Sequence, residues 1–229
     1  MTVLRQQMLD LMIQRGYSEQ THKAYLRAVT DLARYFRTPP DQLKVEQLQE
    51  YFNELVSKRH LSSSSCRQAL NGIRFLYLQV LHWAHFDVHI DIPKRPQKLP
   101  ELLTRSEIEQ IILACRNGKH RMLLMTCYGC GLRVSELVRL KVKHIDGERH
   151  LLRIERGKGN KDRCVLIAES LLGELRQYWR QYQPALWLFP NNLHPQAHLC
   201  VSSAQRIYNA AKRRAGFLRC RFAALDQIA

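Results

Sequence analysis

Two short segments decide how this chain is interpreted: CGLRVSEL at residues 130–137 and RGKGNKDR at residues 156–163. In the first segment Gly131 interrupts a helical pattern, and Arg133 stands where the next helix begins. A guanidinium at a helix N-terminus combines a bidentate fork with the positive end of the helix dipole, which suits a phosphate. In the second segment two glycines flank Lys158, so a turn would hold its amine away from the protein. Taken singly, each segment is also explained by a capped helix start or a basic surface turn.

The sequence around these segments predicts a helical domain with one small β-hairpin. Two β-rich runs, one marked by Leu151 and Ile154 and the other by Val165 and Ile167, flank the glycine turn. Thr104 and Glu107 form a capping-box pattern that opens helices near 105–116 and 119–129. Two more helices are expected near 171–182 and 202–215, the second opened by Ser202 with Gln205.

The first 86 residues predict a bundle of four short helices. Ser18 is placed to cap a helix that runs to Phe36, with Tyr25, Val29 and Leu32 as its buried stripe. A helix near 45–57 would bury Leu48, Tyr51, Phe52 and Leu55. The serine run at 62–65 would cap a last helix that ends near Trp83.

A basic, proline-containing segment separates the two halves. Pro93, Pro96 and Pro100 cannot continue a helix, and they alternate with Lys94, Arg95 and Lys98. We therefore predict a helical domain at 1–86, a linker at 87–103, a second domain at 104–216 and a divergent tail at 217–229. The fold class is mainly α with a small β-hairpin or sheet.

The charge is concentrated in the second half of the chain. The 229 residues carry a formal net charge of +16; residues 1–92 hold 11 Lys and Arg against 9 Asp and Glu, and residues 93–229 hold 25 against 11. A surplus of this size favours a nucleic-acid partner, because neutralised phosphates release counterions. A basic face kept for solubility is the simpler alternative. RNA binding is the less favoured hypothesis, because the predicted strands lack the aromatic residues on which RNA bases would stack.

Other features argue against export, membranes and metals. No apolar run approaches the roughly 18–20 residues that cross a bilayer, and the first residues are charged and amphipathic. Seven cysteines without regular spacing indicate reduced thiols, and the CxxC of Cys127 and Cys130 has no second ligand pair for zinc. We expect a cytoplasmic protein with no cofactor, no metal and no membrane partner, and with both CxxC thiols buried.

In this order and at this spacing, GLRVSEL and GKGNKDR resemble the tyrosine recombinases, the phage, integron and Xer-type integrases. SEQTHKAYLRAVTDLARYF and ALNGIRFLY are similar to the family's SAM-like core-binding domain. PKRPQKLPELLTRSEIEQII resembles its linker and the opening of its catalytic domain, and WLFP with SSAQRIYNAAKRRAG resembles the stretch before its second catalytic box. The resemblance implies a core-binding domain followed by an incomplete α+β catalytic domain.

The resemblance also implies a chemistry that needs no cofactor. In the family a tyrosine attacks the scissile phosphate of DNA and forms a 3′-phosphotyrosyl link. Arg133 would then neutralise the non-bridging oxygens, and Lys158 would protonate the departing 5′ oxygen. Glu136 has a family counterpart that supports the geometry of the site, and a role as a helix-capping or helix-surface residue is equally open.

After Gly216 the sequence departs from the family pattern. The family continues with an HxxR box, a His or Trp and the tyrosine, whereas no His follows His198 and no Tyr follows Tyr208 in these 229 residues. LRCRFAA is similar to the family's LRHSFAT, which would make Arg219 the second phosphate-binding arginine, but Gly216 stands where the His is expected. Tyr208 belongs to an amphipathic helix and is predicted to be a packing residue.

The sequence therefore predicts an integrase-family protein that lacks part of its catalytic set when it acts alone. We expect Leu123, Leu124 and Leu137 to be partly exposed, because family helices that would cover them are missing. The alternative function is a non-catalytic, sequence-specific DNA-binding protein that occupies recombination sites. Expected partners are double-stranded DNA and intact recombinase subunits, and the resemblance implies a bacterial protein associated with the nucleoid in the cytoplasm. Expected DNA contacts are Lys23, Arg27, Arg67, Arg74, Lys94, Arg95, Lys98, Lys161 and Arg163.

Overall fold

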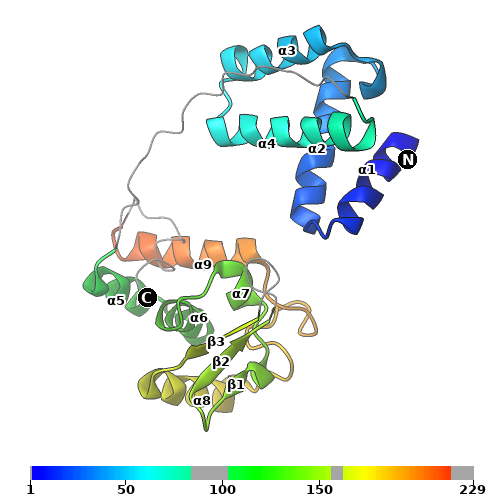
Figure 1. Ribbon diagram of the computed structural model, residues 1–229. Coiled ribbons are helices and arrows are strands. Elements are labelled where there is room, and N and C mark those ends of the chain that lie inside the picture. The colour runs from blue at the N-terminus through cyan, green and yellow to red at the C-terminus, as the bar shows by residue number, and fades with distance from the viewer. Residues whose placement is uncertain (1, 84–102, 156–161, 218–229) are drawn as a thin grey trace. The chain divides into compact units, whose positions relative to one another are not determined.

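The computed structural model describes residues 2–83, 103–155 and 162–217, and the chain divides into two compact units, Met1–Lys98 and Leu99–Ala229 (Figure 1). Most of the expected linker, the glycine turn and the expected tail lie outside the described residues. The predictions made for those segments therefore stay predictions.

All regular secondary structure in the described residues of the first unit is helical. It consists of α1 (Val3–Gln14), α2 (Glu19–Phe36), α3 (Val45–Asn53) and α4 (Ser63–Arg74), with a 3-10 turn at Pro40–Gln42 and π-helical extensions of α3 and α4 at Glu54–Lys58 and Phe75–Val80. Both predicted serine caps are confirmed. Ser18 Oγ accepts a hydrogen bond from the Thr21 amide at 3.2 Å, and Ser62 Oγ accepts one from the Ser65 amide at 3.2 Å.

The core of the first unit follows the predicted pattern on α3 and differs on α2. All four positions predicted for this helix are buried, Leu48, Tyr51 and Phe52 on α3 and Leu55 on its π-helical extension, because together they form one apolar face. On α2, Leu26 and Ala28 are buried, whereas the expected Tyr25 and Val29 are only partly buried. The reason is that α2 contacts both α1 and α4, so its buried face is wider than one stripe.

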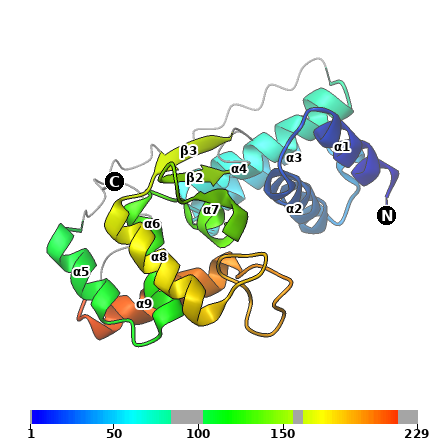
Figure 2. The ribbon, with the colours of Figure 1, turned by 90° about the horizontal axis from the view of Figure 1, so that it is seen from below.

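The second unit combines a small antiparallel sheet with five α-helices and a 3-10 turn at Val142–His144 in its described part (Figure 2). The strands β1 (Ile145–Asp146), β2 (Leu151–Ile154) and β3 (Arg163–Leu166) pair in the order β1-β2-β3. The predicted hairpin is β2 and β3, with Ile154 opposite Arg163 in the register. The two-residue strand β1 was not predicted, because it is too short to show alternation.

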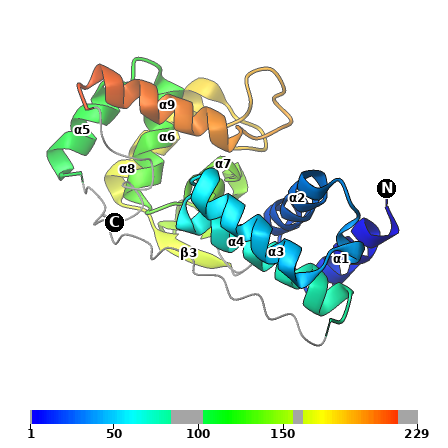
Figure 3. The same ribbon diagram turned by 90° about the horizontal axis from the view of Figure 1, so that it is seen from above.

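The helix α6 is the centre of the second unit. The helices are α5 (Arg105–Leu113), α6 (Gly118–Gly129), α7 (Val134–Val138), α8 (Glu169–Tyr182) and α9 (Val201–Arg214), and α6 contacts each of the other four. Figure 3 shows α9 lying along α6, with α5 near one end. The expected mainly α fold with a small sheet is confirmed. Among the described residues, no helix is long and apolar enough to cross a membrane.

The predicted exposure of the α6 and α7 leucines is wrong. Leu123, Leu124 and Leu137 all have 0% exposure. The helix α8 packs on α6, and α9 packs on α7, so described helices of this chain already cover these side chains. The second unit therefore has a closed core around them.

One of the two predicted capping boxes is confirmed and the other is wrong. Thr104 Oγ1 accepts from the Glu107 amide at 3.3 Å, and Glu107 Oε2 accepts from the Thr104 amide at 2.7 Å. The helix α9 instead begins at Val201 after an extended Cys200, so Ser202 lies inside the first turn and cannot cap it. Its hydroxyl lies 3.2 Å from the Cys200 thiol.

Candidate functional site

Arg133 is placed by the break between α6 and α7. Gly131 has φ +54°, a left-handed conformation that glycine adopts without a steric penalty, and the chain then extends through Arg133 before α7 begins. The helix α7 has only five residues, so its dipole is small and the predicted helix-end contribution to anion binding is weak. Any phosphate site here depends on side chains.

Glu136 organises this corner through three hydrogen bonds. Its Oε2 accepts from the Arg133 amide at 3.0 Å, and its Oε1 accepts from Arg133 Nη1 at 2.9 Å. Its Oε2 also accepts from Arg163 Nη2 at 2.8 Å. The Glu136 side chain is 4% exposed, so the capping role is confirmed and the helix-surface role is wrong. The backbone amide of α7 and two guanidinium groups therefore meet on one buried carboxylate.

The charges of this cluster, defined as Arg133, Glu136 and Arg163, do not cancel. Two guanidinium groups and one carboxylate leave one net positive charge. The Arg133 side chain is 45% exposed, and the described contacts of its guanidinium use Nη1 alone. The remaining donors of Arg133 can meet an anion, which makes the cluster a candidate phosphate site.

The register of the hairpin places this cluster at one end of the segment that carries the predicted lysine. Arg163 is the first residue of β3 and lies opposite Ile154, the last residue of β2, so the chain between these two residues connects the strands. Lys158 and Lys161 belong to this connection, and both are outside the described residues. At the base of the hairpin, Arg153 Nη2 donates to Asp162 Oδ2 at 3.1 Å.

Tyr208 is a packing residue, as the sequence predicted. It lies on α9 with 0% exposure, within the core that α6 and α7 also form. The Lys212 ammonium lies 5.9 Å from the centre of its ring. A phenol in this position cannot reach a phosphate from solvent. Arg219, the expected second arginine, lies outside the described residues.

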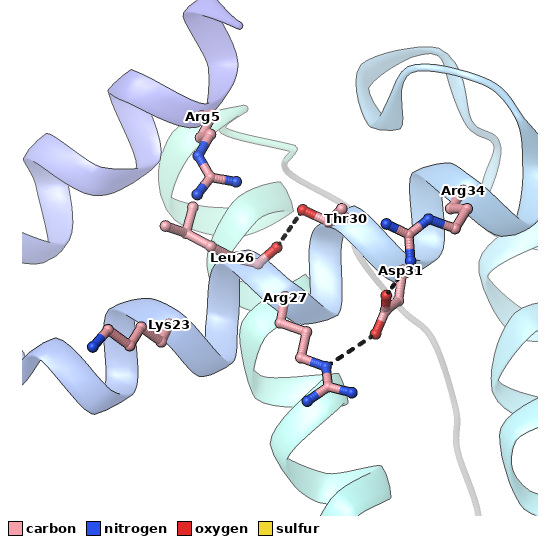
Figure 4. A pocket seen from close by; sticks show the side chains of 7 residues that line it. All are labelled: Arg5, Lys23, Leu26, Arg27, Thr30, Asp31 and Arg34. Atoms are coloured by element: carbon pink, nitrogen blue, oxygen red, sulfur yellow. Dashed lines mark hydrogen bonds and ion pairs between the residues drawn. The ribbon is translucent and has the colours of Figure 1, made fainter. Parts of the chain in front are cut away.

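In the first unit, a basic hollow lies between α1 and the adjacent face of α2 (Figure 4). Lys23, Arg27 and Arg34 from α2 and Arg5 from α1 line it, and Asp31 is its one acidic residue. The Asp31 carboxylate pairs with Arg27 at 3.6 Å and with Arg34 at 3.5 Å. Four cations therefore face one anion across this hollow.

Two of these cations were missed from the sequence. Arg34 follows Arg27 by seven residues, so heptad spacing along α2 could have placed it on the same face. Arg5 belongs to another helix, and no local pattern connects it with α2. Residue spacing alone therefore could not have completed the basic hollow.

The structure separates the other predicted contacts of the first unit. Arg67 lines a second, polar groove between the N-terminal parts of α2 and α4, together with Ser18, Thr21 and the serines at 63–65. Arg74 is exposed at the end of α4. Lys94, Arg95 and Lys98 lie outside the described residues. The predicted basic contacts thus fall on more than one face of the unit.

The thiols of the CxxC are buried. Cys127 is 0% and Cys130 is 4% exposed, and burial raises the pKa of the Cys130 thiol to about 11. Cys127 Sγ donates to the Leu132 carbonyl at 3.2 Å. Among the described residues, no group of three His, Cys, Asp or Glu side chains is placed to hold a metal ion.

Two family models match this chain. One, described as phage integrase, N-terminal SAM-like domain, matches residues 4–84, and the other, described as phage integrase family, matches residues 101–225. The second match includes residues 217–225, part of the expected tail. Residues 1–3, 85–100 and 226–229 fall outside both matches.

Relatives with similar sequences carry related names. A putative integrase/recombinase, y4qK, of Sinorhizobium fredii is 39% identical over 208 residues, which cover 89% of this chain and 67% of y4qK. The tyrosine recombinase XerC of Lactobacillus delbrueckii subsp. bulgaricus is 30% identical over 200 residues, covering 81% of this chain and 67% of XerC. The chain spans 64% and 51% of the lengths of two further relatives, y4eF of Sinorhizobium fredii and an integrase/recombinase of Escherichia coli.

The fold is also similar to that of solved structures. A lambda integrase(75-356) dimer bound to a COC' core site matches with a TM-score of 0.74, at 14% identity, over 100% of this chain and 88% of that chain. At this identity the likeness concerns the fold alone. It agrees with the mainly helical architecture and small sheet described above.

Proposed function

Because the chain belongs to the phage integrase family of tyrosine recombinases, we propose that it binds double-stranded DNA and that Arg133 and Lys158 contact one phosphodiester group. Arg133 would neutralise the non-bridging oxygens as charge develops on phosphorus, and Lys158 would donate a proton to the departing 5′ oxygen. The second unit would hold the reacting strand. The first unit would contact phosphates of the DNA backbone through Lys23, Arg27, Arg67 and Arg74.

The single observation that carries this proposal is the charge balance around Glu136. The buried carboxylate fixes Arg133, and Arg163 leaves the cluster with one net positive charge opposite a solvent-exposed guanidinium. A DNA phosphodiester carries one negative charge, so the charge of the cluster is opposite in sign and equal in size. The basic excess of residues 93–229 favours the same polyanion.

We further propose that a polypeptide of these 229 residues does not cleave DNA alone. Cleavage in this family needs a tyrosine that can reach the phosphate, and Tyr208, the last tyrosine of the sequence, is fully buried. The proposed partners are intact recombinase subunits, which would supply a nucleophile at a shared site. The alternative is a non-catalytic protein that occupies recombination sites.

The test of DNA binding is the salt dependence of affinity for a labelled duplex of about 30 base pairs. Each phosphate contact contributes about −0.9 to the slope of log K against log salt. We expect Arg133→Gln to make the slope shallower by about 0.9. Arg149→Gln is the charge-matched control, since Arg149 pairs with Asp146 on the β1–β2 turn. An equal decrease of the slope in both variants would mean that Arg133 contributes only general electrostatic attraction.

The test of cleavage uses a nicked duplex that traps covalent complexes, carrying sites selected from a random library with the protein itself. We expect no DNA-linked protein after denaturation. A phosphotyrosyl adduct of this chain would overturn the proposal that it is incomplete. Footprints on the same sites test the alternative function. Protection of one half-site would support sequence-specific binding. Binding that does not depend on sequence and is lost by about 200 mM salt would indicate electrostatic attraction alone.

A further inference from the structure

Two nitrogens of the Arg163 guanidinium are directed toward the protein, although the side chain as a whole is 39% exposed. Its Nη2 donates to Glu136 Oε2 at 2.8 Å and lies 3.4 Å from the Gly131 carbonyl oxygen. Its Nε is buried and has no hydrogen-bond partner among the described residues. Two of the three guanidinium nitrogens are therefore turned inward, which is unfavourable for a residue that touches DNA directly.

Arg133 has the opposite arrangement, although it shares the same carboxylate. Glu136 Oε1 holds its Nη1, and Glu136 Oε2 holds its backbone amide. If Arg133 were the only partner of Glu136, the pair would carry no net charge and would attract a phosphate weakly. Arg163 supplies the second positive charge, so Glu136 can anchor Arg133 without neutralising the site.

We propose that Arg163 is a positioning residue that acts on DNA through Glu136 and Arg133 rather than by a contact of its own. It occupies one carboxylate oxygen, which leaves the other to orient the Arg133 guanidinium. It also ties β3, the strand after the glycine turn, to the residues that precede α7. This inference rests on the proposed function, because it assumes that Arg133 meets a phosphate.

A double-mutant cycle on the salt slope tests the inference. The four proteins are the wild type, Arg133→Gln, Arg163→Gln and the double variant, each measured with the same duplex of about 30 base pairs. We expect each single variant to make the slope shallower by about 0.9, and we expect the slope of the double variant to be shallower by the same amount and no more. Arg153→Gln on the neighbouring strand β2 is the charge-matched control, and its effect should add to that of Arg133→Gln.

Two results would overturn the inference while leaving the proposed function intact. A slope about 1.8 shallower in the double variant would mean that Arg163 has its own phosphate contact. An unchanged slope in a folded Arg163→Gln variant, with only its melting temperature lowered, would mean that Arg163 is merely structural. If Arg133→Gln itself leaves the slope unchanged, the proposed function fails and this inference fails with it.

Arg163→Lys keeps the test decisive if Arg163→Gln does not fold. Lysine preserves the charge beside Glu136 but offers a single ammonium group in place of the fork. We expect Arg163→Lys to keep the wild-type slope, because compensation of the carboxylate is its main role. A slope about 0.9 shallower in a folded Arg163→Lys variant would refute the proposal.

Discussion

Glu136 Oε2 lies 2.8 Å from Arg163 Nη2, although the two residues are 27 positions apart in the sequence. This ion pair joins the short helix after the glycine break to the first residue of the hairpin's second strand. Both predicted site segments, GLRVSEL and GKGNKDR, are therefore connected by one buried carboxylate. The connection makes the local fold of the second unit and the charge of the site depend on the same side chain.

Glu136→Gln is expected to destabilise the second unit. The amide keeps the size of the side chain but removes the charge that two guanidinium groups share, and breaking a buried pair typically costs about 3–5 kcal/mol. Because the side chains of both arginines are partly exposed, 45% for Arg133 and 39% for Arg163, solvent weakens the pairs and we expect a smaller loss of about 2 kcal/mol in the free energy of unfolding. Urea unfolding followed by circular dichroism measures it.

The control for this variant is Glu148→Gln, which changes an exposed glutamate on the β1–β2 turn. It should alter the free energy of unfolding by less than about 0.5 kcal/mol. A Glu136→Gln protein as stable as this control would show that the cluster contributes nothing to the fold.

Gly72→Ala is expected to destabilise the first unit by forcing α2 and α4 apart. A Cβ at Gly72 would lie 3.0 Å from Tyr25 Cα and 3.2 Å from Ala28 Cβ, which are too close for an unstrained contact. The expected loss is about 1–3 kcal/mol. Gly173→Ala on α8 is the matched control, because nothing lies within 4 Å of its Cβ, and alanine there should stabilise by about 0.5–1 kcal/mol. Thermal unfolding measures both melting temperatures. A shift of both in the same direction relative to the wild type would contradict this explanation.

Local patterns predicted most of the helices. Ser18, Ser62 and Thr104 each precede an apolar period, and each caps a helix in the structure, because capping depends on residues three apart in sequence. The pattern failed at Ser202, because the helix begins at Val201, two residues earlier than a cap at Ser202 would require. The leucines of α6 and α7 were misjudged because their cover depends on where α8 and α9 pack, and sequence spacing does not show that.

Only part of the candidate site could be predicted from the sequence, because sequence spacing does not show which distant residues come into contact. Arg133 and Glu136 are three residues apart at a helix start, a spacing that already indicates mutual contact. The third member, Arg163, reaches Glu136 only because the hairpin register places it at the start of β3. The basic hollow of the first unit likewise needed Arg5 from a separate helix.

The stability of the second unit should fall as the pH is lowered below the ordinary histidine pKa of about 6.5. Burial lowers the pKa of His144, an effect that Glu155 opposes and that Lys141 and Lys143 reinforce. Burial likewise lowers the pKa of His120, and Lys119 and Arg214 add to it. The unfolded chain then binds more protons than the folded one, so stability is full above pH 6.5 and is lost as the pH falls.

The variant His144→Asn tests this pH dependence. Asparagine can still accept the hydrogen bond that the Lys141 amide donates to His144 Nδ1 at 3.2 Å, but it does not titrate. Its free energy of unfolding should decline less than that of the wild type between about pH 7.5 and pH 5.5, and His120→Asn should reduce the decline further. If the free energy of unfolding declined with pH equally in all three proteins, the pH dependence would not arise from these histidines.

Among the six cysteines of the described residues, Cys200 should react fastest with iodoacetamide near neutral pH. Hydrogen bonds between its sulfur and the hydroxyls of Ser202 and Ser203 lower its thiol pKa to about 7, and the residue is exposed before α9. Cys66, Cys115, Cys127 and Cys130 are buried and should stay unmodified in the native protein. Mass spectrometry of the alkylated peptides measures the order. Ser203→Ala, which removes one of the two hydroxyls, should slow the reaction at pH 7 and shift its midpoint upward, whereas an unchanged rate would show that the hydroxyls do not stabilise the thiolate.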